Sequence, residues 1–233
     1  MSRAATARPF DGGHAQSSET RPPILCLHGL GRTAADWDGV RAGLTAVGTV
    51  SSPMVPREPS LALELLRRTA RPGTVLIGHS LGGLQALGLA VEPGMAPSAV
   101  VLTGCFFPPA LNGRSLLRST WDFGGHRIAL ATSLVRDNGI KRPRRGTGSA
   151  LASMIALVAR PTRSRAMLAA VRCPVLVVHA RDDHHVPVDF ALAAAARRPG
   201  WSLHVFDEGG HHLHMTRPDD WLGVVGPWLA THL

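Results

Sequence analysis

An apolar run that ends in a Gly-Ser-Gly turn constrains this chain more than any other stretch of its sequence. Residues 75–77 are apolar without alternation, which is typical of a strand buried on both faces of a parallel sheet. Residues 84–87 suit a helix, and Gly78-x-Ser80-x-Gly82 lies between the two segments. A serine in so sharp a turn has a strained backbone, and its flanking residues approach so closely that both must be glycine. The stretch therefore predicts a serine hydroxyl raised above the sheet, beside the N-terminal amides of the next helix.

Further apolar runs alternate with helical patterns along the rest of the chain. The other expected strands are residues 23–27, 47–50, 99–102, 173–179 and 201–206. The expected helices are residues 37–44, 61–70, 81–91, 189–197 and 219–229, the last interrupted or kinked at Gly226-Pro227. Continuous apolar strands that alternate with helices indicate a sheet covered on both faces. The expected fold class is α/β, a three-layer sandwich around a mostly parallel sheet of about six strands.

The alternation breaks at about residues 105–170, which follow the strand expected at 99–102. Ligands bind outside the carboxyl ends of strands in such sheets, so this insertion is expected to be a small helical cap or lid. Its aromatic and aliphatic candidates for pocket walls, each equally able to be core residues, are Phe106, Phe107, Trp121, Phe123 and Leu130. Residues 1–21 are expected to be a flexible leader, and residues 22–233 a single domain that contains the cap.

Composition places the chain among ordinary globular proteins. Its 233 residues are 45% hydrophobic and 18% charged, and it has no tyrosine, which excludes tyrosine as acid, base or oxyanion donor. The three cysteines lie in or beside apolar runs, which favours free thiols and a reducing compartment, hence a cytoplasmic location. The first 20 residues lack the apolar segment of a secretory signal, and no run reaches the ~20 apolar residues that span a bilayer.

The formal net charge is +9, and nearly all of the positive charge is arginine. The densest basic run, residues 141–145 (Lys-Arg-Pro-Arg-Arg), has three interpretations. It resembles a nucleic-acid patch, it is also ordinary for a solvated loop in an arginine-biased chain, and it could attract anionic substrates over a distance. The solvated loop is the preferred interpretation, so no nucleic-acid partner is expected.

Two later loops carry residues that could activate the serine. A hydroxyl is a weak nucleophile until a base takes its proton, and an acid holds that base in one tautomer. Asp182 and Asp183 follow one apolar run, and His211, His212 and His214 follow the last one. Because the carboxyl ends of parallel strands share one edge of a sheet, both loops are expected beside the serine. Both aspartates are candidates for the orienting acid.

A tetrahedral intermediate also needs hydrogen-bond donors for its oxyanion. The amide of Leu81, directly after the serine, is one candidate, and the Leu30 amide in the His28-Gly29-Leu30 loop after the first strand is the second. His28 is interpreted as a structural residue that braces this loop, because His211 fills the role of the base better.

The number of histidines also invites a metal hypothesis. Neutral imidazoles and carboxylates are good zinc ligands, and His184 and His185 would join the three later histidines at the same sheet edge. Their spacings match no metal motif, and HExxH is absent. No metal or other cofactor is therefore expected, and the extra histidines are expected to line the rim of the site or lie in solvent.

From residue 23 to residue 233 the chain resembles the α/β-hydrolase superfamily, in its branch of small esterases. The motifs that carry the resemblance are His28-Gly29-Leu30-Gly31 with Trp37, Gly78-His79-Ser80-Leu81-Gly82-Gly83, Asp183 three residues before Val186-Pro187, and Gly210-His211 seven residues before Pro218. The resemblance implies that Asp183 is favoured over Asp182 and that His211 is favoured over the other histidines. Ala180 is a departure, since the family usually has glycine there.

The catalytic residues that the resemblance implies are Ser80, Asp183 and His211, with supporting positions at His28, Gly29, Gly78, His79 and Gly82. The expected activity is hydrolysis of a carboxylic ester or thioester of a small to medium acyl group, through an acyl-enzyme. C–C bond hydrolysis, acyl transfer and perhydrolysis use the same triad and stay open, as does a non-catalytic ligand-binding role on the same fold. The expected partner is a small-molecule substrate, with no membrane partner, and the oligomeric state is left open.

Overall fold

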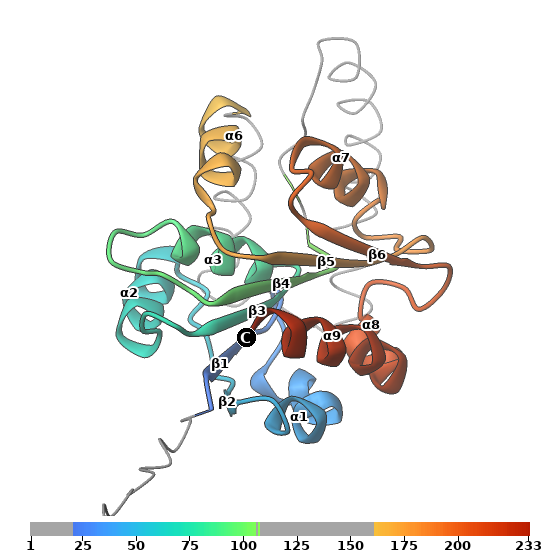
Figure 1. Cartoon of the computed structure of the whole chain (residues 1–233), viewed down its shortest axis with the longest axis horizontal. Coiled ribbons are helices and arrows are strands. Elements are labelled where there is room, and N and C mark those ends of the chain that lie inside the picture. Colours follow the sequence, from blue (N-terminus) through green and yellow to red (C-terminus); the bar gives the residue numbers. More distant parts are fainter. Residues whose placement is uncertain (1–20, 106, 108–160) are drawn as a thin grey trace, which may run out of the picture.

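A single six-stranded sheet organises the computed structural model, which describes residues 21–105, 107 and 161–233 (Figure 1). Its strand order is β2-β1-β3-β4-β5-β6, and every neighbouring pair is parallel. The strands are β1 (Pro23–Leu27), β2 (Thr49–Ser51), β3 (Val75–His79), β4 (Ala99–Thr103), β5 (Val175–Ala180) and β6 (Ser202–Phe206). The expected α/β class with about six strands is confirmed, and in the described residues the sheet is wholly parallel.

Helices cover both faces of the sheet. They are η1 (Ala34–Trp37), α1 (Asp38–Thr45), α2 (Pro59–Thr69), α3 (Leu81–Ala90), α6 (Pro161–Ala170), α7 (Asp189–Arg197), α8 (Leu213–Thr216) and α9 (Pro218–His232). The core on one face joins the strands to α2, α3, α6 and α7, and the core on the other face joins them to α1 and α9. Figure 1 shows α1 and α9 side by side below the sheet, which gives the three layers that the alternation predicted.

The strand side chains divide between two cores because successive residues point to opposite faces. In β1, Leu25 and Leu27 pack in the core of α2 and α3, whereas Ile24 and Cys26 pack in the core that contains Trp37. All of β3 and β4 is buried, as expected of central strands in a covered parallel sheet.

Several predicted boundaries differ from the structure by one to three residues, and two of the differences have a clear local cause. The second strand was predicted at 47–50 but begins at Thr49, because the amides of Val47 and Gly48 both donate to the carbonyl of Leu44 and close α1 instead. The last helix is not interrupted at Gly226-Pro227, the first of the two predicted alternatives, because α9 continues through both residues. Proline removes only one helix hydrogen bond, and buried residues on both sides, Trp221, Val225 and Leu229, hold the helix against the sheet.

Several sequence predictions lie outside the described residues. They include the leader, nearly all of the insertion, the basic run at 141–145 and all the candidate pocket walls except Phe107. Phe107 is buried, with its ring centroid 6.2 Å from that of Trp201, so it is a core residue. The end of the insertion, residues 161–170, forms α6, a helix that the pattern did not predict.

The three cysteines are free thiols, two of them buried and Cys173 half-buried. Among the described residues no helix is both long enough and apolar enough to cross a bilayer.

Candidate active site

Ser80 sits on a strained turn between β3 and α3. Its φ of 53° and ψ of −116° make it the one non-glycine residue with positive φ in the described part of the chain. A Cβ on Gly78 would lie 2.5 Å from Cα of Gly83 and would also strike the carbonyl of Gly82, so the turn closes only with glycine there. The Ser80 amide donates to the carbonyl of Thr103 at 3.0 Å, which holds the turn against β4. The serine itself is half-buried.

The loop after β1 lies directly against this turn. A Cβ on Gly29 would be 3.3 Å from Cβ of Ser80, and a Cβ on Gly82 would strike the carbonyl oxygen of Leu27 and come within 2.8 Å of that of His28. The loop and the first turn of α3 therefore pack backbone against backbone. This close approach brings the segments of both predicted oxyanion donors, the amides of Leu30 and Leu81, to one place.

His28 uses both ring nitrogens inside the loop. The Val55 amide donates to Nε2 at 3.0 Å, so Nε2 is the acceptor. Nδ1 then carries the hydrogen and lies 2.9 Å from the carbonyl oxygen of Gly29. The ring is buried and ties the loop after β1 to residue 55, the arrangement expected of a bracing residue.

Asp183 and His211 meet although they are 28 positions apart. Nδ1 of His211 lies 2.8 Å from Oδ2 of Asp183, and because a carboxylate only accepts, Nδ1 carries the hydrogen. Nε2 of the imidazole is then the nitrogen that can accept a proton. Oδ1 of Asp183 accepts from the amides of His185 and Val186, each at 2.8 Å, so the carboxylate is held at both oxygens.

Asp182 has a different role from its neighbour. Its Oδ1 accepts from the amide of Gly210 at 2.8 Å, and its Oδ2 from the amide of Gly209 at 3.2 Å. Both glycines have positive φ, 132° at Gly209 and 66° at Gly210, so the backbone that delivers His211 is an irregular turn. Asp182 therefore holds the loop, and Asp183 holds the imidazole.

His179 is a partner of the acid that the sequence analysis did not identify. It lies in β5 with a fully buried side chain, and its Nε2 donates to the carbonyl of Val186 at 2.8 Å while lying 3.4 Å from Oδ2 of Asp183. It thus ties the loop that carries Asp183 back to the strand. An imidazole within the otherwise apolar run 175–180 was the signal that could have identified it.

His79, directly before Ser80, contacts His211, the residue that the sequence analysis predicts to be the base. Its Nε2 donates to the backbone carbonyl of His211 at 3.0 Å, and the two ring centroids are 4.7 Å apart. From the other side, a Cβ on Gly104 would be 2.9 Å from the same carbonyl oxygen. Gly104, with φ of 52°, directly follows the residue whose carbonyl binds the Ser80 amide, so His211 packs against both sides of the serine turn.

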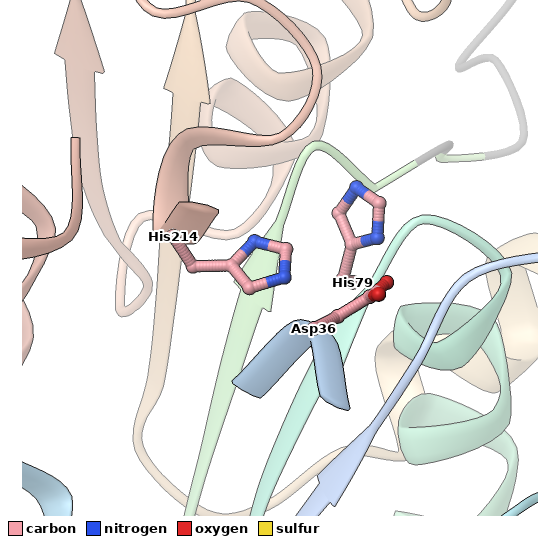
Figure 2. Close-up of side chains that lie close together, drawn as sticks. All are labelled: Asp36, His79 and His214. Atoms are coloured by element: carbon pink, nitrogen blue, oxygen red, sulfur yellow. The ribbon is translucent and has the colours of Figure 1, made fainter. Parts of the chain in front are cut away.

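A buried polar cluster lies behind this turn (Figure 2). Asp36 of η1, His79 of β3 and His214 of α8 point toward one another there, and their donor atoms lie within 4.8 Å of one another. Arg32 binds both oxygens of Asp36, at 2.8 and 2.9 Å. His214 is fully buried, and its ring centroid lies 4.3 Å from that of Trp37. The expectation that the extra histidines lie at the rim or in solvent is wrong for His214, because it packs as a core aromatic.

The other histidines of these two loops differ in exposure. His184 is exposed, and His185 and His212 are half-buried. The ring of His185 stacks on that of His211, with centroids 4.7 Å apart and planes 25° apart. Asp183, His185 and His211 form a second group of residue types that can bind a metal ion, and their potential ligand atoms also lie within 4.8 Å of one another.

Burial favours the neutral form of four histidines at the site, His79, His179, His212 and His214. It lowers the pKa of His214 to about 3 and that of His212 to about 4, and repulsion between neighbouring imidazoles adds to the effect. It also lowers the pKa values of His79 and His179. Burial alone would raise the pKa of Asp183, but its hydrogen bonds outweigh burial and bring the pKa below the ordinary value. The acid is therefore ionised at neutral pH, and the His179 imidazole beside it is uncharged.

Comparisons with known proteins place this geometry in a family. The model described as the alpha/beta hydrolase family matches residues 24–223. A pimeloyl-[acyl-carrier protein] methyl ester esterase from Aromatoleum aromaticum is 29% identical over 238 residues, which cover 86% of this chain and 95% of that protein.

Solved structures share the fold at lower identity. A putative lipase from Acinetobacter baumannii superposes with a TM-score of 0.70 at 19% identity, covering 92% of this chain and 85% of that one. The 2-hydroxy-6-oxo-6-phenylhexa-2,4-dienoate hydrolase of a Rhodococcus species gives 0.64 at 23% identity, covering 91% and 90%. The matched region contains all of the sheet except Pro23, together with both loops of the site, and we conclude that this chain belongs to the alpha/beta hydrolase family.

Proposed function

We propose that this protein hydrolyses carboxylic esters of small to medium acyl groups through an acyl-enzyme on Ser80. The observation that carries the proposal is the hydrogen-bonded pair of Asp183 and His211, which packs against the strained turn of the half-buried serine. An oriented imidazole with a free Nε2 beside a raised hydroxyl is the arrangement that nucleophilic acyl transfer requires.

The chemistry would proceed in two halves. Oγ of Ser80 attacks the ester carbonyl while Nε2 of His211 takes its proton, and the amides of Leu30 and Leu81 stabilise the oxyanion. The C–O bond to the alcohol then breaks, and the imidazolium returns the proton to the leaving alkoxide. Water, activated by the same imidazole, releases the acid and restores the serine. Asp183 stays ionised throughout and stabilises the imidazolium.

The relative from Aromatoleum aromaticum supports the substrate class, because its name describes an esterase that acts on a pimeloyl-[acyl-carrier protein] methyl ester. We infer an ester of a small alcohol, with the acyl chain held by the segment at 105–170 that follows β4. A thioester is a close alternative because the same steps expel a thiolate. C–C bond hydrolysis, acyl transfer and perhydrolysis remain alternatives on the same triad.

A fluorophosphonate probe tests the nucleophile directly. The wild-type protein should be labelled on Ser80, and Ser80→Ala should not be labelled. Absence of labelling of the wild type, or equal labelling of both proteins, would favour a non-catalytic ligand-binding role. The substrate class is then read from hydrolysis of p-nitrophenyl esters of graded chain length, beside methyl esters, an acyl-CoA and a lactone. A maximum at short to medium chains is expected, and hydrolysis of none of these compounds by a protein that the probe labels would reject the ester assignment.

A further inference from the structure

Two methionine side chains at the surface contact the loop after β1, which carries the predicted oxyanion donor Leu30. Met54 is 58% exposed and Met215 is 40% exposed, so both sulfurs belong to side chains that solvent reaches. Sδ of Met54 accepts from the amide of Ala34 at 3.3 Å. Sδ of Met215 accepts from Nη2 of Arg32 at 3.1 Å. Two exposed thioethers therefore hold the same segment of chain at two points.

Met54 is joined to this loop a second time, through the next residue of the chain. The amide of the buried Val55 donates to Nε2 of His28 at 3.0 Å. Leu30 comes two residues after His28. A displacement of Met54 is therefore passed to the loop through its own sulfur and through the bond between Val55 and His28.

Met215 connects the loop to the segment of the expected base. It lies in α8, four residues after His211, and its amide donates to the carbonyl of His212 at 2.7 Å. The arginine that its sulfur contacts, Arg32, also binds both oxygens of Asp36, at 2.8 and 2.9 Å. The sulfur of Met215 thus joins two segments that each carry a part of the expected catalytic machinery.

Hydrogen peroxide oxidises exposed thioethers. The sulfur lone pair attacks one peroxide oxygen, and the S–O bond forms as the O–O bond breaks. The transferred hydroxyl gives its proton to the departing hydroxide, which leaves as water. Sulfur loses two electrons and the peroxide gains them. The product, methionine sulfoxide, is polar, and its oxygen is a far stronger hydrogen-bond acceptor than a thioether sulfur.

The added oxygen does not fit into the present contacts. A hydrogen bond from an amide to an oxygen takes about 2.9 Å by itself. Only 3.3 Å separates the Ala34 nitrogen from the sulfur of Met54, and only 3.1 Å separates Nη2 of Arg32 from the sulfur of Met215. An oxygen that accepts from either donor therefore forces the sulfur and the loop apart. An oxygen that points to solvent leaves an electron-poor sulfur facing the same N–H, which weakens the contact.

We propose that Met54 and Met215 are sites of oxidative modification by hydrogen peroxide, and that their sulfoxides lower the activity by displacing the loop that carries Leu30. The Leu30 amide then no longer meets the oxyanion together with the Leu81 amide. A thiol-dependent methionine sulfoxide reductase reverses the modification. The loss of activity rests on the proposed esterase function, whereas the modification and the displacement do not.

Peptide mapping by mass spectrometry tests the sites without any assumption about catalysis. In full-length protein treated with hydrogen peroxide, Met54 and Met215 should become sulfoxides before Met95 and Met167, which are half-buried and pack against the core. Faster oxidation of Met95 or Met167 would overturn the assignment. Hydrogen–deuterium exchange of the peptide that contains Leu30 should be faster in the oxidised protein, and unchanged exchange would reject the displacement.

Hydrolysis of a p-nitrophenyl ester is the second readout. Peroxide should lower the wild-type rate roughly 10-fold or more, and the reductase with a thiol should restore it. The double variant Met54→Leu/Met215→Leu keeps the side-chain volumes but has no sulfur there to oxidise, so it should retain its own untreated rate. The matched control Met95→Leu should lose activity as the wild type does.

Equal inactivation of the wild type and the double variant would overturn the proposal. Sulfoxides at both positions with unchanged hydrolysis would reject the effect on activity. Sulfoxides and faster exchange in a protein that hydrolyses no ester would support the modification and reject the esterase assignment alone.

Discussion

Nε2 of His79 lies 3.0 Å from the backbone carbonyl oxygen of His211, so the residue before the expected nucleophile holds the expected base. The bond connects the end of β3 to the loop after β6, which are 132 positions apart in the chain. A displacement of either segment would move the imidazole relative to the serine. The geometry of the site therefore depends on this contact as well as on the pair of Asp183 and His211.

Replacement of His79 tests this dependence. His79→Leu removes the donor to the His211 carbonyl, and the resulting shift of the imidazole should lower kcat by about 10- to 100-fold with little change in KM. His79→Gln retains an N–H donor and should recover part of the loss. Steady-state kinetics on a p-nitrophenyl ester measures the effect, and a rise in KM with unchanged kcat would mean that His79 acts on substrate binding instead.

The adjacent acids should differ sharply when each is converted to its amide. Asp183→Asn loses the carboxylate on Nδ1 of His211 and should lower kcat by roughly 10³- to 10⁴-fold. Asp182→Asn keeps one acceptor for the amides of Gly209 and Gly210 and should lower kcat only a few-fold. Its main effect should be on stability, a loss of about 1–2 kcal/mol. Steady-state kinetics and urea unfolding of both variants test these expectations. A larger loss of kcat in Asp182→Asn than in Asp183→Asn would make Asp182 the acid that orients His211.

Acid should destabilise the fold through its buried histidines. The folded-state pKa of His214, about 3, is below its ordinary value of 6.5. Below pH 6.5 the unfolded chain therefore binds a proton that the folded chain does not, so the free energy of unfolding falls as pH falls towards 3. One such group contributes at most about 1.4 kcal/mol per pH unit.

His214→Phe, which keeps an aromatic ring against Trp37, should reduce the difference in unfolding free energy between pH 7 and pH 5. Urea unfolding at the two pH values measures that difference. His184→Ala, an exposed control, should leave it unchanged. Asp183 does not contribute between pH 7 and pH 5. Its pKa in the folded protein is lower than the ordinary value of 3.8, so the stability that it provides is lost only at more acidic pH. An unaltered pH difference in His214→Phe would show that this histidine is not a source of the acid sensitivity.

Two glycines of α3 should respond in opposite directions to alanine. A Cβ on Gly82 would meet the carbonyl oxygens of Leu27 and His28, so Gly82→Ala should destabilise by about 1–3 kcal/mol and separate the two predicted oxyanion donors. A Cβ on Gly88 would meet nothing within 4 Å, so Gly88→Ala should stabilise by about 0.5–1 kcal/mol with activity retained. Urea unfolding and kcat for both variants test the pair. A neutral Gly82→Ala would contradict the close packing of the loop after β1 on α3.

Most of the sheet was predictable because its strands are continuous apolar runs. Residues 23–27 and 189–197 have the predicted boundaries, since an apolar run or an alanine-rich segment is closed there by proline, glycine or charged residues. One error arose where the apolar character of a residue and its local hydrogen bonding disagree. Val47 has the apolar character of a strand residue, yet its amide completes the turn that ends α1.

At the candidate site the sequence by itself determined the turn of Ser80, because only glycine at 78 and 82 permits that backbone, and the edge of the sheet at which the acids and histidines gather. Tertiary structure decided the partners. Asp182 and Asp183 are chemically identical neighbours, and successive side chains in a loop point in different directions, so one binds backbone amides and the other binds an imidazole. The same holds for His211 and His214, which contact the strand residue before Ser80 and the ring of Trp37, both from distant segments. Those contacts join residues far apart in the chain, and no local pattern encodes which way each ring points.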